Sequence, residues 1–270
     1  MTVESGAPGY ALQLSDAERT RYREMARRAR DAEADRWHRY GIVPGARVAD
    51  IGCGPGAVLV LLAELVAPGG SVVGVEPDAA ARAAAAEEIR LAGVENATVV
   101  EGNGVATTLE AGAYDTVMIR HVLFHVGAKL AAVIDHAASL LRRGGHLYAV
   151  DSDVSGIRLS VDDTDVEEQI ARYREFQRNR GNNVDVGPRL GPLIGGAGLE
   201  VLEQAGWFSA VPAPLLTLGG PIVAARSEML GAGIITEHDA RRYDEAMKRV
   251  TGVPHAVLFM PLFLAVGRKP

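Results

Sequence analysis

The sequence contains one cysteine, three lysines and no long apolar run. The single thiol, Cys53, can form neither an intrachain disulfide nor a multi-thiolate metal site, so nothing in the cysteine content indicates secretion. No stretch approaches the roughly 18 to 20 consecutive apolar residues that a membrane span needs, and the N-terminus lacks the apolar core of a signal peptide. We therefore expect a cytoplasmic protein with no membrane partner.

The charge of the chain disfavours a second class of partner. Twenty-eight Lys and Arg against 34 Asp and Glu give a net charge of −6, so the overall field repels nucleic acid. A composition of 48% apolar and 23% charged residues over 270 residues is ordinary for a globular protein and excludes a disordered or collagen-like chain. A sizeable hydrophobic core is available.

The apolar pattern changes along the chain. Tyr22, Met25, Ala29 and Trp37 recur with a helical period and predict one long amphipathic helix that ends near Gly41. Short apolar runs then alternate with helical segments, which predicts strands at 47–51, 71–76, 98–101, 114–120 and 146–151 and helices at 57–66, 79–92 and 129–141. This alternation is typical of a parallel sheet covered on both faces.

After Asp153 the alternation stops, and residues 162–182 predict a polar helix that we interpret as an insertion. Strands are expected again at 200–211 and 256–267, with a helix at 237–250 that Thr236 caps. We divide the chain into an N-terminal helical cap segment, 1–41, and a domain, 42–270, with helical insertions at about 154–189 and 219–251.

The stretch from Val48 to Gly56 predicts a strand, a glycine turn and the start of a helix. Glycines let the chain turn sharply and bring bare backbone N–H groups against a ligand at a helix N-terminus. Glu76 ends the next strand, 20 residues after Gly56, where a carboxylate can accept hydrogen bonds from both hydroxyls of a ribose. Together these features predict a nucleoside-bearing cofactor. NAD stays an alternative ligand, although Ala57 stands at the third glycine position of the dinucleotide fingerprint.

Five motifs in this order and spacing resemble the class I S-adenosylmethionine (SAM)-dependent methyltransferases: VADIGCGPG, VVGVEPD, VVEGN, YDTVMI and LLRRGGHLYAVD. The resemblance covers about residues 40–153 and extends more weakly to the C-terminus. The segment Tyr10 to Leu12 and the phrase RHVLFHV are similar to the small-molecule branch related to ubiquinone/menaquinone-type enzymes. The resemblance implies an α/β, Rossmann-like fold with a seven-stranded, mostly parallel sheet whose last strand is antiparallel, plus an N-terminal helix and an inserted helical lid.

The resemblance also implies the residues that bind SAM and its product S-adenosylhomocysteine (SAH): Asp50, Gly52, Gly54, Gly56, Glu76, Pro77, Asn103, Gly104 and Arg120. Asp50 and the backbone of the first two glycines would hold the methionine end, and Glu76 would hold the ribose. Pro77 would lie against the adenine. Asn103 departs from the acidic residue that the family often has, but its carbonyl oxygen can accept from the adenine amino group. The sequence RRGG, where the family commonly has R-P-G-G, affects a turn.

For the chemistry, a general base is needed only if the acceptor must lose a proton early, and a histidine suits this near neutral pH. His125 is our first candidate and His121 the second; they lie four apart and could face one way on a helical turn. We expect no metal, because no third ligand is evident. The acceptor pocket is expected to include Tyr10, Tyr22, Asp151, Tyr173, Gln177 and Arg180.

Several of these side chains have a second interpretation. The aromatic ones could be core packing, Asp151 and Asp153 could cap helices, and the arginines near 172–180 could either clamp an anionic substrate or form a solvated face paired with Glu167, Glu168 and Glu175. The N-terminal helix could serve a homodimer or a lid.

The sequence as a whole predicts a SAM-dependent methyltransferase acting on an O, N or C atom of a small metabolite, in secondary metabolism. No acidic residue follows the fourth strand, where catechol-type enzymes need a magnesium ligand, and no [DN]-P-P-[YF] signature of DNA-base methylation is present. The alternatives are a methyltransferase fold that binds SAM but catalyses a non-methylating reaction such as cyclisation, an NAD-dependent oxidoreductase, and a non-catalytic scaffold. A scaffold would be expected to carry damage in the glycine turn or at Glu76, and neither is damaged.

Overall fold

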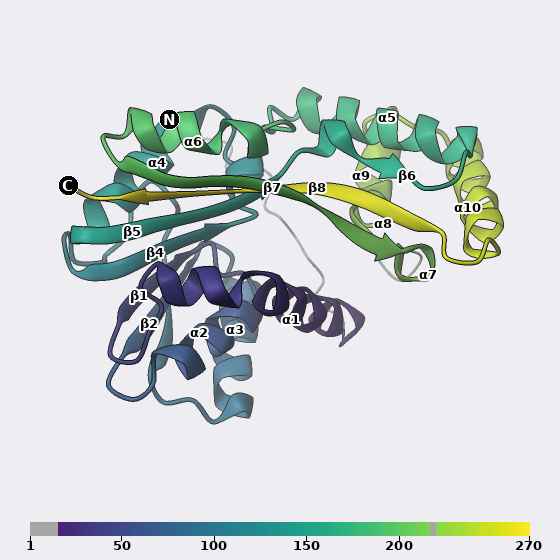
Figure 1. Cartoon of the computed structure of the whole chain (residues 1–270). Coiled ribbons are helices and arrows are strands. Elements are labelled where there is room, and N and C mark those ends of the chain that lie inside the picture. Colours follow the sequence, from purple (N-terminus) through teal and green to yellow (C-terminus); the bar gives the residue numbers. More distant parts are fainter. Residues whose placement is uncertain (1–15, 217–219) are drawn as a thin grey trace, which may run out of the picture. The chain divides into compact units, whose positions relative to one another are not determined.

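Eight strands form one mixed sheet in the computed structural model, which describes residues 16–216 and 220–270 (Figure 1). The strand order is β3-β2-β1-β4-β5-β8-β6, and β7 pairs with β8 outside this path. The strands are β1 Arg47–Ile51, β2 Ser71–Glu76, β3 Ala97–Glu101, β4 Tyr114–Arg120, β5 Leu141–Ser152, β6 Arg158–Leu159, β7 Glu200–Pro212 and β8 Val257–Arg268.

The strand directions confirm the expected sheet. Strands β1, β2 and β3 are parallel, with Val48 opposite Val72 and Val72 opposite Ala97. Strands β7 and β8 are antiparallel. Strand β8 also runs against β5, because Lys269 bonds to Gly145 at one end and Asp153 donates to Pro261 at the other. The fold is therefore α/β and Rossmann-like, with a mostly parallel sheet and antiparallel C-terminal strands.

The chain forms two compact units, and each is described by itself. The first comprises the chain up to Met118, residues 135–147 and Lys269, and the second comprises residues 119–134, 148–268 and Pro270. The first unit contains α1 Asp16–Arg39, α2 Ala57–Val66 and α3 Ala79–Ala92. The second contains α5 Thr164–Asn179, α6 Leu190–Gly196, α7 Ala213–Leu216, α8 Pro221–Ala224, α9 Arg226–Gly231 and α10 Glu237–Thr251, while α4 Leu130–Leu140 contributes to both.

The first unit packs its helices on strands that are apolar on both faces. Val48, Ala49 and Ile51 of β1 are buried, as both-face burial of a parallel strand requires. Helix α1 joins this unit through the fully buried Trp37 and through Arg23, which makes two hydrogen bonds of 2.9 and 2.7 Å to the carboxylate of Glu88 on α3. The domain division at residue 41 stays a prediction.

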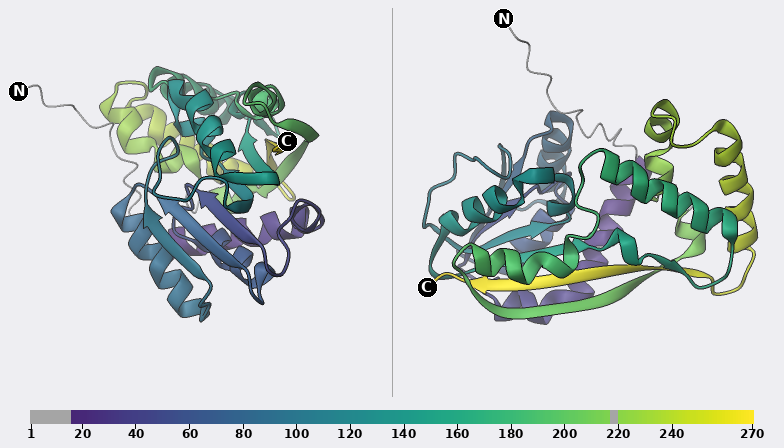
Figure 2. Two further views of the ribbon diagram at one scale, coloured as in Figure 1. Left: turned by 90° about the vertical axis from the view of Figure 1, so that its left-hand side faces the viewer. Right: turned by 90° about the horizontal axis from the view of Figure 1, so that it is seen from above.

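The second unit carries the predicted inserted helix, α5, beside α10 (Figure 2). Thr236 and Asp239 form a capping box at the start of α10, as expected from Thr236. Ion pairs join the two helices: Arg172 to Asp239, Arg242 to Asp165 and Glu168, and Arg249 to Asp163 and Asp165. Arg172 also pairs with Glu168 within α5. The polar face of α5 is thus largely neutralised by charges of its own unit.

One predicted strand boundary was wrong, and one short strand was not predicted. Strand β5 begins at Leu141 rather than 146, so the RRGG segment lies in the strand and not in a turn. Its first residues pair with the C-terminal tail, where Lys269 bonds to Gly145, and the Lys269 ammonium donates to the carbonyls of Ala138 and Leu141 at the end of α4. The short strand β6 was not predicted, because two residues carry no readable periodicity.

Candidate functional site

The glycine turn between β1 and α2 is fastened to the end of β2. The N–H groups of Gly52 and Cys53 both donate to the carbonyl of Val75, at 2.7 and 3.1 Å. Gly52, Gly54 and Gly56 have φ angles of 75°, 54° and 85°, a region that L-residues rarely adopt. The turn therefore needs glycine at all three positions for its backbone alone.

The glycines of this turn differ in what surrounds them. A Cβ atom on Gly56 would lie 2.9 Å from Ala85 Cα, so this glycine allows α2 and α3 to approach each other. A Cβ atom on Gly54 would meet no protein atom within 4 Å. The space beside Gly54 is thus open, as a cradle for a ligand requires.

Glu76 lies at the edge of this open space, at the end of β2. Its Oε2 accepts a hydrogen bond from Gly54 N and its Oε1 accepts one from Asp78 N, each at 3.0 Å. Burial raises the pKa of Glu76, while these two N–H groups act in the opposite direction. A carboxylate has about four acceptor positions, so both oxygens can still accept hydroxyl groups of a ligand while the backbone holds them in place.

One part of the expected geometry was wrong. The N–H groups of Gly52, Gly54 and Gly56 are not bare, because they donate to Val75 O, Glu76 and Cys53 O. The N-terminus of α2 has no side-chain cap, since Gly56 occupies the N-cap position. Donors for an anionic group of a ligand therefore come from the first turn of α2 rather than from the glycines.

Asp50 and Cys53 flank the turn from the inside. Asp50 is 3% exposed on β1. Cys53 is buried, and this burial, followed by the charges of Asp50 and Glu76, raises the pKa of its thiol well above the ordinary value. A thiol that stays protonated is a poor nucleophile, so Cys53 acts as a small residue of the turn, in agreement with the sequence-based interpretation.

The two residues that are expected to contact the adenine, Pro77 and Asn103, are exposed. Pro77 is exposed, and the Arg82 guanidinium fixes the peptide before and after it by donating to the carbonyls of Glu76 and Pro77 at 2.9 and 2.6 Å. Sequence reasoning missed Arg82, because an arginine on a helix is usually a solvated group. Asn103 is exposed beside Gly104, but its Oδ1 already accepts from Val105 N and Ala106 N, at 3.0 and 3.1 Å. The oxygen that is expected to accept from adenine thus already accepts two backbone N–H groups.

In the second unit, the two candidate histidines do not share a helical turn. His121 follows β4 with a φ of 57°, and its N–H donates to Val150 O. His125 ends a separate 3-10 turn, η1 Leu123–His125. The two histidines therefore do not lie on one common helical turn. A non-glycine residue in the left-handed region costs free energy and is often found at functional sites.

His125 keeps an exposed surface, and its ring packs edge-on against Phe124 with 4.7 Å between the ring centroids. Desolvation by the surrounding protein lowers the pKa of His125 below its ordinary value, and the positive charge of Arg180 lowers it further. Water still reaches the exposed side of the residue and tempers this effect. The imidazole is therefore neutral at pH 7 and able to accept a proton.

Asp151 ends β5 and is 1% exposed. Its Oδ2 accepts from Phe124 N at 3.1 Å and its Oδ1 from Ser152 N at 2.8 Å. Asp151 thus accepts from a backbone N–H of the η1 turn, and Asp153 caps the 3-10 turn η3 Val154–Gly156. Burial raises the pKa of Asp151 to about 6, against the opposing effect of its N–H donors and of Arg120.

This raised pKa gives a stability prediction. The folded state binds the Asp151 proton more tightly than the unfolded chain does, so its contribution to stability is complete below about pH 4 and is lost as the pH rises through about 6. Between pH 5 and pH 8, the free energy of unfolding of Asp151→Asn should rise relative to the parent by about 1.4 kcal/mol. Urea denaturation at both pH values measures this difference. A difference that does not change with pH contradicts the prediction.

The other predicted substrate residues of this unit lie on α5 and its C-cap. Tyr173 and Gln177 are buried. Arg180 pairs with Glu228 of α9 and lies 5.3 Å from the ring centroid of Phe176. Neighbouring arginines are also engaged: Arg174 donates to the carbonyls of Val154 and Ile157, and Arg172 pairs with Glu168 and Asp239. These contacts favour the solvated, internally paired interpretation over an anion clamp.

Sequence reasoning missed Asn183, which follows α5 and bonds to the η1 turn. Tyr10 lies outside the described residues. Tyr22 lies on α1 in the first unit, with the Arg21 guanidinium 4.8 Å from its ring centroid. The residues that the structure brings together are thus Asp50, the glycines, Glu76 and Pro77 in one unit, and Arg120, His125, Asp151 and Arg180 in the other.

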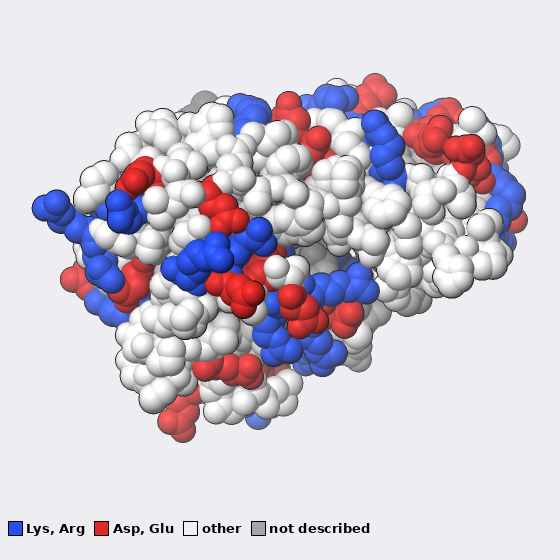
Figure 3. Space-filling model, in the orientation of Figure 1, with Lys and Arg blue, Asp and Glu red and all other residues white. Residues whose placement is uncertain are grey.

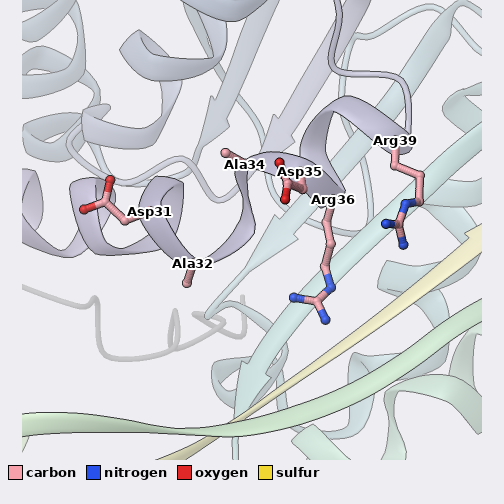
Figure 4. Close-up of a pocket in the computed structure, with 6 residues that line it drawn as sticks. All are labelled: Asp31, Ala32, Ala34, Asp35, Arg36 and Arg39. Atoms are coloured by element: carbon pink, nitrogen blue, oxygen red, sulfur yellow. The ribbon is translucent and has the colours of Figure 1, made fainter.

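A hollow of about 290 Å³ on α1 is not part of this site (Figure 4). Within the part of the chain that the structure describes, it is lined by six residues of that helix, namely Asp31, Ala32, Ala34, Asp35, Arg36 and Arg39. Among residues 16–216 and 220–270, no group of three or more His, Cys, Asp or Glu side chains could hold a metal ion. No helix in these ranges is both long and apolar enough to cross a membrane.

The region that contains the glycine turn is similar to known proteins. Residues 48–145 match a family model described as a methyltransferase domain. The chain is 38% identical over 131 residues to nocamycin O-methyltransferase of Saccharothrix syringae, a match that covers 47% of this chain and 42% of that protein. The chain thus spans less than half the length of this curated relative.

Solved structures share the fold over a longer range. Geranyl diphosphate methyltransferase in complex with SAM has a TM-score of 0.54 at 16% identity, covering 95% of this chain and 92% of that chain. The cyclase SpnF has a TM-score of 0.57 at 17% identity, covering 90% of this chain and 82% of that chain. At these identities the similarity concerns the fold alone, and the same fold carries both kinds of activity.

Proposed function

We propose that this chain is a class I methyltransferase that binds SAM and transfers the methyl group to a small acceptor. Its residues 48–145 match the model of a methyltransferase domain. The observation that carries this proposal is the pairing of Glu76 with Gly54. The carboxylate is fixed by the Gly54 N–H, and the space beside Gly54 is open. This arrangement fits a ribose on the carboxylate and the rest of an adenosyl ligand along the turn.

The residues proposed to hold SAM are Asp50, Gly52, Gly54, Gly56, Glu76, Pro77, Asn103, Gly104 and Arg120. When bound, SAM supplies an electrophilic methyl group on a sulfonium, which is already a good leaving group. The chain must mainly orient the acceptor, and such positioning can lower a barrier by roughly 7 to 11 kcal/mol. Gly56 contributes by packing, since Ala85 fills the space where its side chain would lie.

We assign the proton transfer, where the acceptor needs one, to His125, with His121 as the second candidate. A neutral imidazole can accept a proton from an acceptor hydroxyl, and the lowered pKa of His125 keeps it neutral at pH 7. Tyr10, Tyr22, Tyr173, Gln177 and Arg180 remain proposed acceptor contacts. Asp151 contributes by holding the η1 turn that ends in His125.

An oxygen atom is the acceptor we favour, because nocamycin O-methyltransferase is the relative with 38% identity. A small molecule of secondary metabolism agrees with that relative and with the net charge of −6, which disfavours nucleic acid. Acidic and basic side chains are interspersed on the face drawn in Figure 3.

Isothermal titration calorimetry with SAM, SAH and NAD tests the proposal. We expect micromolar binding of SAM and SAH and none of NAD, followed by transfer of a labelled methyl group to an acceptor from a panel of small hydroxyl compounds. Binding of NAD alone would identify an oxidoreductase. SAM binding with turnover of a substrate but no loss of the methyl group would identify a non-methylating enzyme, the activity class of SpnF.

A further inference from the structure

The turn that ends in His125 is held from two sides within the second unit. On the side of β5, Asp151 accepts from Phe124 N and Val150 O accepts from His121 N. On the other side lies the segment that follows α5. In this segment Asn183 is half-buried, and its backbone and side-chain N–H groups all donate to the turn and its flank.

Asn183 makes three hydrogen bonds to carbonyls on both sides of His125. Its Nδ2 donates to Leu123 O at 3.1 Å and to Gly127 O at 2.9 Å. Its backbone N donates to Phe124 O at 2.8 Å. One side chain therefore spans the turn from residue 123 to residue 127 and fixes the backbone from which the imidazole projects.

The same segment is attached to α5. Asn182 donates through its side chain to Gln177 Oε1 at 2.6 Å and through its backbone to Gln177 O at 3.0 Å. A Cβ atom on Gly127 would lie 3.2 Å from Gly181 O, so the two loops are in close contact. A displacement of the C-terminal end of α5 must therefore move the carbonyl partners of Asn183 or break these bonds.

We propose that Asn183 is a positioning residue that holds His125 for proton transfer and couples it to the helix α5. The proposal rests on the proposed function for the role of His125, but the bonds of Asn183 do not depend on that role. A single amide that satisfies two carbonyls orients the backbone more strictly than water would, because both donors leave from one rigid plane.

The ring of His125 reports on this positioning without any substrate. The charged group that acts on the ring is Arg180 at the end of α5, which pairs with Glu228 of α9. The other charged residues of the neighbouring elements are Asp151, which bonds to Phe124 N, and Lys129 in the 3-10 turn η2 Gly127–Lys129. If Asn183→Ala releases the turn, the ring gains water and moves away from Arg180. The midpoint of its titration should then rise by roughly one pH unit.

The experiment is an NMR titration of the histidine Cε1–H resonances in the full chain, with His125 assigned from a His125→Gln variant. Asn182→Ala is the matched control, because it removes the neighbouring amide, whose bond goes to Gln177 rather than to the turn. We expect the shift in Asn183→Ala and none in Asn182→Ala. Equal midpoints in the parent and Asn183→Ala would overturn the proposal.

One further variant and one further measurement make the result of the titration interpretable. Asn183→Ser retains one side-chain donor and should give an intermediate midpoint; it replaces the alanine variant if that does not fold, and a midpoint equal to the parent's again overturns the proposal. SAM affinity is measured for the parent and for Asn183→Ala, which should agree within twofold. A parent that binds no SAM would refute the proposed function, while the titration would still decide the role of Asn183.

Discussion

We expect the substitution Glu76→Ala to abolish measurable SAM binding. The carboxylate would accept two hydroxyl groups of the ligand, and hydrogen bonds to a charged group contribute about 1.5–3 kcal/mol each. Their loss should weaken binding by roughly a hundredfold or more. The substitution also leaves the N–H groups of Gly54 and Asp78 without their acceptor, which loosens the turn itself.

Glu101→Ala is the matched control for this variant. Glu101 stands opposite Glu76 in the register of β2 and β3 and ends its own strand, but it pairs with Arg82 at the surface. Its loss should leave SAM affinity within twofold of the parent. Calorimetry with SAM and SAH on all three proteins measures the effect. Retained affinity in Glu76→Ala would remove the proposed ribose site, whatever the control does.

Gly54→Ala is the second substitution with a large expected effect. A methyl group there enters the open space in which the ligand is proposed to lie, so SAM affinity should fall at least tenfold. The left-handed φ of 54° adds a backbone cost of about 1–2 kcal/mol to the stability of the variant. Binding and stability must therefore be measured together, by calorimetry and by thermal unfolding.

Gly93→Ala separates the two contributions. Gly93 ends α3 with a φ of 67°, and a Cβ atom on it would also meet no protein atom within 4 Å. It carries the same backbone strain and the same freedom from clashes, away from the glycine turn. We expect both variants to lose similar stability and only Gly54→Ala to lose affinity. Equal affinities in the two would show that the open space is not the ligand site.

Local signals in the sequence predicted much of the first unit. Helices α2 and α3 and strands β1, β2 and β4 have the predicted bounds, because apolar runs, the glycine turn and the start of each helix are written in neighbouring residues. The link between Gly54 and Glu76 was foreseen only as proximity to a common ligand. That the two bond to each other, and that Val75 O takes the N–H groups of the turn, required the register of β1 and β2.

The sequence predicted less of the structure of the second unit. The strands β7 and β8 and the helix α10 were predicted within a residue or two, and so was the pairing of the α5 arginines with Glu168, but their distant partners were not. An arginine that pairs with a carboxylate 67 or more residues away, as Arg172 does with Asp239 and Arg249 with Asp163, has the same local sequence as one that faces solvent. Only the packing of α5 against α10 distinguishes them.

The sequence by itself determined the order of elements, the fold class and the residues of the glycine turn, since each depends on side-chain chemistry within a few positions of the chain. The tertiary structure alone decided which groups are already engaged. The N–H groups of the glycines, Asn103 Oδ1 and the carboxylate of Asp151 all have protein partners. It also decided that Asn183 bonds to the turn ending in His125, across about 60 residues of chain. Such pairings follow from strand register and helix packing, and no local pattern encodes them.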